Sequence, residues 1–272
     1  MKVALLLTGY PRSHKVSRHN IKSLFIDKYD TDIFIALNSN NKNSLHNTDV
    51  NNMADDINIK EVLDFYNPID SVIFNSYDSI FMNDMSKLDD NAKNMLPLVK
   101  FKNLFEQFYI VKKAYELLLN HVKRTGTHYD IVMRVRLDTI IVEPHRLSQI
   151  KNMNISSTLG NVDESVIETI KNISESMDLN LHIPKSNEIC VDDWDNIQPN
   201  VQWTNEHIWG HSAELSPIMY EYYDELFGII NEVSLIKIFL LIYPYSEIFF
   251  SRFIELHNLK LVKNEFKIRI IR

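Results

Sequence analysis

Short, continuous apolar runs alternate with helical patterns in the first half of this chain. Val3 to Leu7 is the first run and ends at Thr8-Gly9, Asp32 to Leu37 is the second, and Ser71 to Phe74 is the third. Runs of this length without polar alternation are typical of strands that are buried on both faces of a parallel sheet. We therefore predict three such strands, and a surface loop over Asn38 to Asn52, which is rich in Asn, Ser and Asp.

The clearest helix is predicted over Asn103 to Val122, and a fourth strand over Tyr129 to Leu137. The helix has one apolar stripe at three- and four-residue steps, formed by Leu104, Phe108, Val111, Tyr115, Leu118 and Val122. The strand begins apolar and becomes charged at its end. Strands that alternate with helices predict an α/β fold with a mostly parallel sheet and helices on both faces.

The second half of the chain is less regular. Its sequence pattern predicts helices over Val162 to Met177, Ser216 to Val233 and Ser246 to His257, with strands near 259–262 and 266–271. There is no internal repeat and no convincing linker, so we expect a single domain over residues 1–272, with a first half of 1–142 and a second half of 143–272.

Composition excludes several functional classes. Five glycines leave no G-x-G-x-x-G loop and no Walker-type loop, which removes most dehydrogenases and P-loop NTPases. A formal net charge of -7 argues against a nucleic-acid partner, because phosphate binding requires a basic patch. The lone Cys190 excludes an internal disulfide and a cysteine-cluster metal site.

Neither long apolar stretch fits a membrane segment. The apolar start is too short for a secretory signal and lacks a small-residue cleavage site. Leu235 to Phe250 is interrupted by Lys237, Pro244 and Glu247. We therefore expect no transmembrane segment and a cytoplasmic protein.

Three polar segments are candidates for chemistry. Thr8 to Ser13 follows the first strand, where a glycine permits close backbone approach and Arg12 can grip a phosphate. Alternation along the fourth strand puts Arg134, Arg136 and Asp138 on one side, where charges face a cleft or an internal ion network. Trp203 to His211 combines aromatic, acidic and histidine side chains, a mixture that suits sugar recognition.

Each of these segments also has a structural interpretation. The first can be a turn with a surface arginine, the second a purely structural ion network, and the third a partly buried turn. Asp193-Trp194-Asp195 is a rival D-x-D segment, but it lies outside a recognisable strand end, and its acids are expected to be solvated in a loop. The histidines without ligand spacing are expected at the surface: His14, His19, His46, His121, His128 and His145.

Taken together, the segments resemble a family, the small GT-A-like glycosyltransferases of bacteria and large DNA viruses. Leu5 to Arg12 is similar to their opening "hhhSGQxR", and Tyr29 to Ile35 to their "YDxDVFIH". Tyr129 to Asp138 resembles "YDIVIRxRPD", Asn205 to Gly210 resembles "NDxFxxG", and Tyr243 to Glu247 resembles a late "xPE". The matches run in order from residue 3 to about 262.

This resemblance implies a GT-A fold, a nucleotide-sugar donor and a divalent cation, Mn²⁺ or Mg²⁺. Asp138 takes the place of the last acid of the D-x-D motif and is the expected metal ligand. Arg136 stands where the first Asp is expected and could itself neutralise the diphosphate. Glu206 stands where the family usually has Asp.

The expected function is transfer of a sugar from a nucleotide diphosphate sugar to a hydroxyl of a glycan or another acceptor, with 1–142 as the nucleotide-binding half and 143–272 as the acceptor-side half. The site residues implied are Thr8, Gly9, Pro11, Arg12, Arg134 and Arg136 for the donor, Trp203, Asn205 and Trp209 for the acceptor, and Glu206, His207 or Glu247 for catalysis. A nucleotidyltransferase and a non-catalytic nucleotide-sugar-binding domain remain as alternatives.

Overall fold

The computed structural model of the chain describes residues 1–11, 14–39, 59–94, 98–151, 163–177, 180–191, 208–234, 246–263 and 267–270. Its strands are β1 (Lys2–Gly9), β2 (Asp30–Asn38), β3 (Asp70–Phe74), β4 (Ile131–Arg136), β5 (Thr139–Val142), β6 (Glu188–Val191), β7 (Ile208–His211), β8 (Lys260–Lys263) and β9 (Lys267–Ile270). Its α-helices are α1 (His14–Ile21), α2 (Ile59–Tyr66), α3 (Asp78–Ser86), α4 (Asp90–Lys93), α5 (Leu98–Thr125), α6 (Leu147–Lys151), α7 (Glu164–Glu175), α8 (Ser216–Ser234) and α10 (Ser246–Leu256).

Seven of these strands form one mixed, mostly parallel sheet in the order β3-β2-β1-β4-β7-β6-β8. Strands β1, β2, β3 and β4 pair in parallel, whereas β7 is antiparallel to both β4 and β6, so only β7 runs against the others. Strands β5 and β9 form a separate antiparallel pair. The main sheet therefore contains strands from both halves of the chain, and the predicted α/β class is confirmed.

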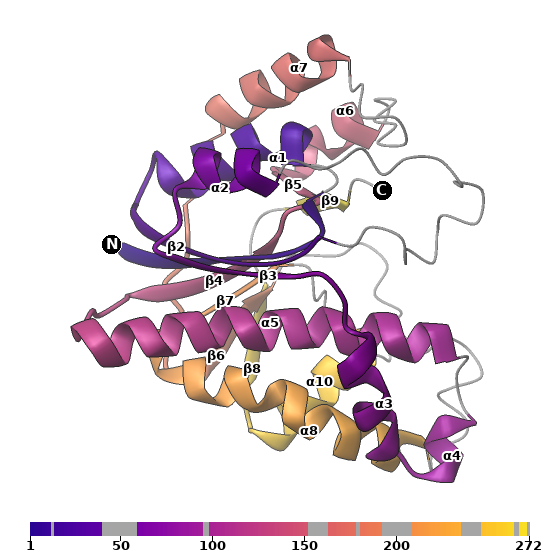
Figure 1. Cartoon of the computed structure of the whole chain (residues 1–272). Helices are drawn as coiled ribbons and strands as arrows, with labels where there is room; N and C mark the ends of the chain where they lie inside the picture. The colour runs from indigo at the N-terminus through magenta and orange to yellow at the C-terminus, as the bar shows by residue number, and fades with distance from the viewer. Residues whose placement is uncertain are drawn as a thin grey trace.

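Helices cover both faces of this sheet (Figure 1). On one face, Ala4 and Leu6 of β1 pack in a core with residues of α5, α8 and α10. On the other face, Val3, Leu5 and Leu7 pack with residues of α1, α2 and α7. Because successive strand residues point to opposite faces, a run that is apolar at every position fits a strand between two such cores.

The helices follow the expected patterns, and α5 is the longest of those described. Its buried residues lie at helical spacing and include Phe108, Val111, Tyr115 and Leu118, which join the core shared with α8. Helix α7 begins after Asp163, whose carboxylate accepts a hydrogen bond of 2.9 Å from the backbone N–H of Ser165. The predicted helices of the second half are α7, α8 and α10.

Some sequence expectations are wrong in detail. Asn38 was expected to begin a loop, but it ends β2 and is buried, while 40–52 lie outside the described residues. His14 and His121 were expected at the surface and are buried against aromatic rings. Residues 208–211 were expected in a turn and instead form the strand β7 inside the sheet, because β4 and β6 pair with it on both sides.

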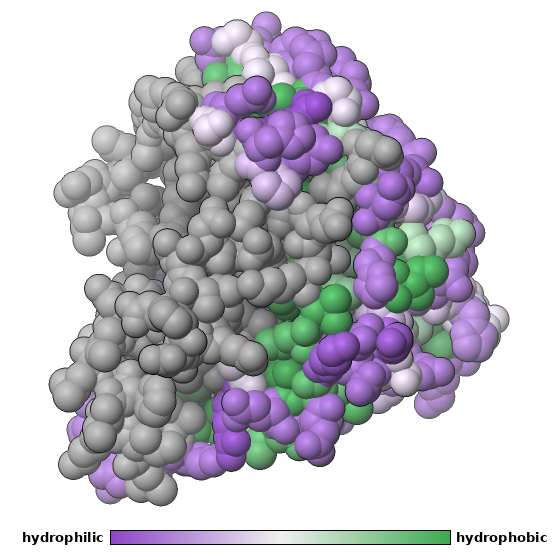
Figure 2. Space-filling model, turned by 180° about the vertical axis from the view of Figure 1, so that it is seen from behind, coloured by the Kyte–Doolittle hydropathy of each residue, from purple (hydrophilic) through white to green (hydrophobic). Residues whose placement is uncertain are grey.

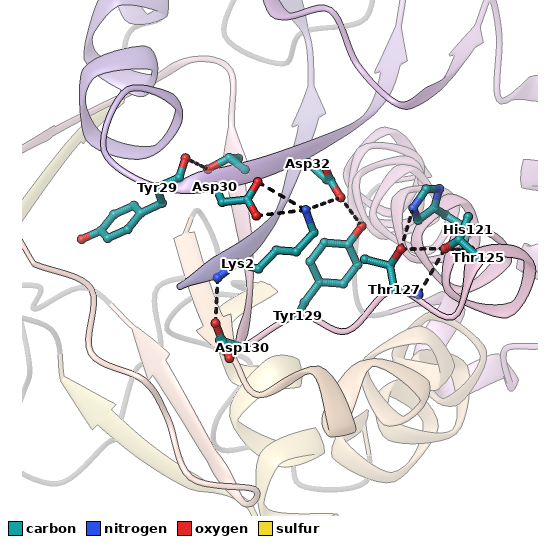
Figure 3. Close-up of polar contacts among 10 residues, drawn as sticks. Lys2, Tyr29, Asp30, Asp32, His121, Thr125, Thr127, Tyr129 and Asp130 are labelled. Carbon is teal, nitrogen blue, oxygen red and sulfur yellow. Dashed lines mark hydrogen bonds and ion pairs between the residues drawn. The ribbon is translucent and has the colours of Figure 1, made fainter.

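Strands β1, β2 and β4 begin at one edge of the sheet, which we call the amino edge (Figure 3). There the Lys2 ammonium lies 3.3 Å from an oxygen of Asp30 and 3.1 Å from one of Asp32, and the Tyr129 hydroxyl donates to Asp32 over 2.8 Å. The backbone N–H of Lys2 donates to the Asp130 carboxylate over 2.7 Å. These contacts tie the starts of the three strands together.

Candidate functional site

The opposite edge, where β1, β2 and β4 end, is the carboxyl edge, and it contains the topological switch point of the sheet. From β1 the chain adds β2 and then β3 on one side, and afterwards returns through α5 to place β4 on the other side of β1 (Figure 1). In open α/β sheets, ligands bind outside the carboxyl ends of strands at the point where the order reverses. The ends of β1 and β4 are therefore the candidate site.

Strand β1 contributes Thr8 and Gly9 to this edge. Thr8 is buried, and its backbone carbonyl accepts a hydrogen bond of 3.1 Å from the N–H of Leu137, which follows β4. Gly9 has a φ of +104°, a conformation that side chains with a Cβ rarely adopt, and no atom of the described residues lies within 4 Å of where a Cβ would stand. The turn after β1 thus needs glycine, and the described residues leave space beside its backbone. Pro11, also predicted for the donor, is buried just beyond it.

Strand β4 contributes Arg134, which is only 1% exposed. Its Nε donates to the Thr8 hydroxyl over 2.9 Å, and its guanidinium lies 4.6 Å from the centre of the Trp209 ring. A buried guanidinium is costly unless hydrogen bonds and a ring face replace its hydration. Arg134 thus joins the end of β1 to β4 and β7 beneath the carboxyl edge.

Trp209 was predicted to contact an acceptor, and the structure does not support this role. Its indole is fully buried in β7, stacks on Phe250 at a centroid distance of 4.8 Å and donates from Nε1 to the Tyr115 hydroxyl over 2.9 Å. The Tyr115 hydroxyl also lies 2.7 Å from Nε2 of His211, whose pKa burial lowers to about 4. These four side chains are core residues behind the site, and His211 is neutral at pH 7.

Arg136 and Asp138 form a bidentate ion pair at the end of β4. Nε of Arg136 donates to Oδ1 of Asp138 over 2.8 Å, and Nη2 donates to Oδ2 over 2.7 Å. Arg134 and Arg136 share one face of β4, as alternation predicts, whereas Asp138 belongs to the turn between β4 and β5. The Asp138 side chain is 1% exposed and the Arg136 side chain 13% exposed. The carboxylate of this pair is therefore fully buried, whereas the guanidinium remains partly accessible to solvent.

This pairing does not fit a divalent cation at Asp138. Both carboxylate oxygens already accept from a guanidinium, and a cation placed there would meet the positive charge of Arg136. Among the residues that the structure describes, no three His, Cys, Asp or Glu side chains are grouped as a metal site. The rival D-x-D segment, Asp193-Trp194-Asp195, lies outside the described ranges.

Sequence reasoning missed a second polar group at this edge. Glu106 of α5 is buried, and its Oε2 accepts from the Tyr10 hydroxyl over 2.8 Å, while the Asn38 side-chain amide donates to its Oε1. Burial raises the pKa of this carboxyl above its ordinary value. The sequence does place this acid between Phe105 and Phe108, in an apolar part of the predicted helix. That position indicates a buried carboxyl group, but it does not identify the residues that hydrogen-bond to it.

Several predicted residues are not placed by the structure. Arg12, Trp203, Asn205, Glu206 and His207 lie outside the described residues, and for Glu247 only the backbone is described, near the start of α10. The structure brings Thr8, Gly9, Arg134, Arg136 and Asp138 together at the ends of β1 and β4. The predicted roles of the others stay predictions.

None of the described helices is both long and apolar enough to cross a bilayer. Hydrophilic residues are spread over the described part of the back of the molecule, with apolar patches between them (Figure 2).

The sequence was also compared with known proteins. No protein-family model matches it, and a search of curated proteins finds no match.

Proposed function

We propose that this protein is a glycosyltransferase with a GT-A-like fold, which moves a sugar from a nucleotide diphosphate sugar to a hydroxyl of a glycan or another acceptor. The observation that carries the proposal is the switch point between β1 and β4, where a glycine turn and a paired arginine lie side by side. The resemblance of the sequence segments supports the same assignment.

In this proposal, the turn after β1 receives the nucleotide. Gly9 leaves the backbone open for close approach, and Thr8 is held by Arg134 so that the turn keeps its shape. Arg136 would face the diphosphate, and Asp138 fixes the plane of its guanidinium through two hydrogen bonds. A preoriented positive group stabilises the charge that develops on the departing nucleoside diphosphate.

The acceptor side depends on residues outside the described ranges. Trp203 and Asn205 are proposed to contact the acceptor, and Glu206 or His207 to remove the proton of its hydroxyl, with Glu247 as a further candidate base. Mn²⁺ or Mg²⁺ remains part of the proposal only through ligands other than Asp138. We assign no step of the reaction to the cation.

Product analysis distinguishes the proposed enzyme from its alternatives. A thermal-shift screen against UDP, GDP, CDP and TDP sugars first identifies the donor, because a ligand bound only by the folded state raises the Tm. The selected sugar nucleotide is then incubated with the protein, with and without EDTA. A glycosyltransferase releases nucleoside diphosphate, by transfer or by slow hydrolysis to water.

The other possible outcomes support one of the alternative functions or contradict the proposal. A nucleotidyltransferase would form or consume pyrophosphate instead of releasing nucleoside diphosphate, and a binding domain would raise its Tm without forming a product. Loss of product in EDTA would show that the reaction requires a divalent cation. No Tm shift with any of the four donor classes would contradict the proposal.

A further inference from the structure

Glu106 connects the loop after β1 and the last residue of β2 to helix α5. One carboxylate oxygen accepts from Tyr10, which directly follows Gly9, and the other accepts from Asn38, the last residue of β2. The acid itself comes from α5, the helix that carries the chain across to β4. A single side chain therefore joins three elements at the carboxyl edge.

The contact is unlike an ordinary surface hydrogen bond, because Glu106 is 2% exposed. A buried carboxylate is tolerated only where donors replace its lost hydration, and hydrogen bonds to a charged group are stronger than neutral ones. Its removal would leave the donors of Tyr10 and Asn38 without this acceptor. The position of the Tyr10 loop is therefore coupled to Glu106.

We propose that Glu106 is a positioning residue of the donor site, which holds the Gly9–Tyr10 turn and the end of β2 in the arrangement that binds the nucleotide. This inference rests on the proposed function, because it assigns Glu106 to the same site. Glu106 would act through Tyr10 and Asn38 and would not touch the donor itself.

The ionised form of Glu106 is the one that accepts from both partners. Burial raises its pKa, while the hydrogen bond from Tyr10, nearby Lys102 and the amide of Asn38 lower it, and Asp78 raises it. Lys102 and Asp78, the charged groups that face Glu106 from α5 and α3, pair with each other. Protonation leaves Glu106 with one acceptor and one donor, the same set that a glutamine side chain offers at this position.

The test compares variants that remove the carboxylate, keep its shape or remove one donor. Glu106→Ala removes both acceptors, and Tyr10→Phe removes only the hydroxyl. Glu106→Gln offers an acceptor to Tyr10 and, after a flip of the Asn38 amide, a donor to that residue. Tyr129→Phe is the matched control, because it removes a Tyr–carboxylate hydrogen bond of the same length, 2.8 Å, at the amino edge.

Two readouts are needed. Hydrogen exchange of residues 5–11, corrected for intrinsic rates, reports the loop without any nucleotide, and titration with the donor reports the site. We expect faster exchange and about fivefold or greater loss of donor affinity in Glu106→Ala and Tyr10→Phe, with no larger loss in the double variant. Glu106→Gln should stay close to wild type, because its amide offers an acceptor to Tyr10 and a donor to the flipped Asn38 side chain.

The outcomes separate this inference from the proposed function. Wild-type exchange in both Tyr10→Phe and Glu106→Ala would overturn the inference, and so would faster exchange with unchanged donor affinity. A wild-type protein that binds no nucleotide sugar would overturn the proposed function and the donor role together. If Glu106→Ala does not fold, Tyr10→Phe carries the test, because Glu106 keeps its contact with Asn38.

Discussion

The charged side chains at the amino and carboxyl edges of the same three parallel strands differ in their exposure to solvent. At the amino edge, Lys2 lies between two carboxylates, and the side chain of Asp30 is 71% exposed to solvent (Figure 3). At the carboxyl edge, Arg134, Asp138 and Glu106 are almost completely buried. Solvated ion pairs cost little to form, whereas buried charges are costly and need several partners.

This difference agrees with the proposed location of the donor site at the carboxyl edge. A chain that needed only to close the ends of its strands could use partly exposed ion pairs at both edges, such as those of Lys2 with Asp30 and Asp32 at the amino edge. The buried arginines and acids instead lie at the switch point, where parallel sheets bind ligands. Local choices that reduce stability are expected at functional sites.

The largest expected difference between the edges concerns Asp138. Asp138→Asn removes the charge that pairs with Arg136 and should lower the free energy of unfolding by about 3 kcal/mol, because it breaks a buried ion pair. Donor binding should weaken as well, since Arg136 loses its orientation. Urea unfolding and donor titration measure both effects. A stable variant with normal donor affinity would remove this pair from the site.

Acid should lower the free energy of unfolding through His14, the first residue of α1, which follows the loop after β1. Burial lowers its pKa to about 3, so the unfolded chain binds a proton near pH 6.5 that the folded chain rejects. Stability is therefore full above pH 6.5 and is lost as the pH falls toward 3, by up to about 1.4 kcal/mol per pH unit.

His14→Phe should flatten this dependence without loss of stability at pH 7. Neither ring nitrogen of His14 has a hydrogen-bond partner in the described part of the chain, and the ring packs against Phe65 and Tyr66. Urea unfolding at pH 7, 6 and 5 compares the variant with wild type. Parallel pH profiles would show that another group causes the acid sensitivity.

Amino-edge changes should affect stability alone. Tyr129→Phe removes one hydrogen bond to Asp32 and should cost about 1 kcal/mol at pH 7, with donor affinity unchanged. Burial raises the pKa of Tyr129, so the unfolded chain releases this proton first and stability falls as the pH rises above about 10. The variant should show a smaller alkaline loss. Reduced donor affinity in Tyr129→Phe would break the contrast between the edges.

The smallest effect is expected for Arg124→Lys, near the end of α5. Arg124 is exposed and close in the chain to the amino edge, and surface substitutions of this kind usually change stability by less than about 0.5 kcal/mol. A Tm within error of wild type and normal donor affinity are expected. A clear loss of either would mean that the amino edge contributes more than its exposed contacts suggest.

The parts of the fold that the sequence predicts are those defined by a local pattern. The continuous apolar runs of β1 and β2 and the stripe of α5 are visible without knowledge of their partners. Strands β6 and β7 have four residues each, and their extended form depends on pairing with each other and with β4 and β8. Such pairing is a long-range property that no local period reveals.

The same distinction applies to the site. Alternation predicts that Arg134 and Arg136 share a face of β4, because the period of a strand is a local property. That Asp138 would accept from both Nε and Nη2 of Arg136, or that Glu106 would reach Tyr10 and Asn38, depends on how α5 and the β4–β5 turn are placed. The burial of Trp209 likewise follows from its position inside the sheet.

Calorimetric titration of a matched arginine pair tests most directly whether the carboxyl edge binds the diphosphate of a nucleotide sugar. Arg136→Lys keeps the charge but loses the bidentate geometry, and Arg124→Lys makes the same change at an exposed position. We predict that wild type and Arg124→Lys bind the selected donor equally, and that Arg136→Lys binds it about tenfold more weakly or worse. Equal affinity of all three folded proteins would contradict the assignment of the donor site to the ends of β1 and β4.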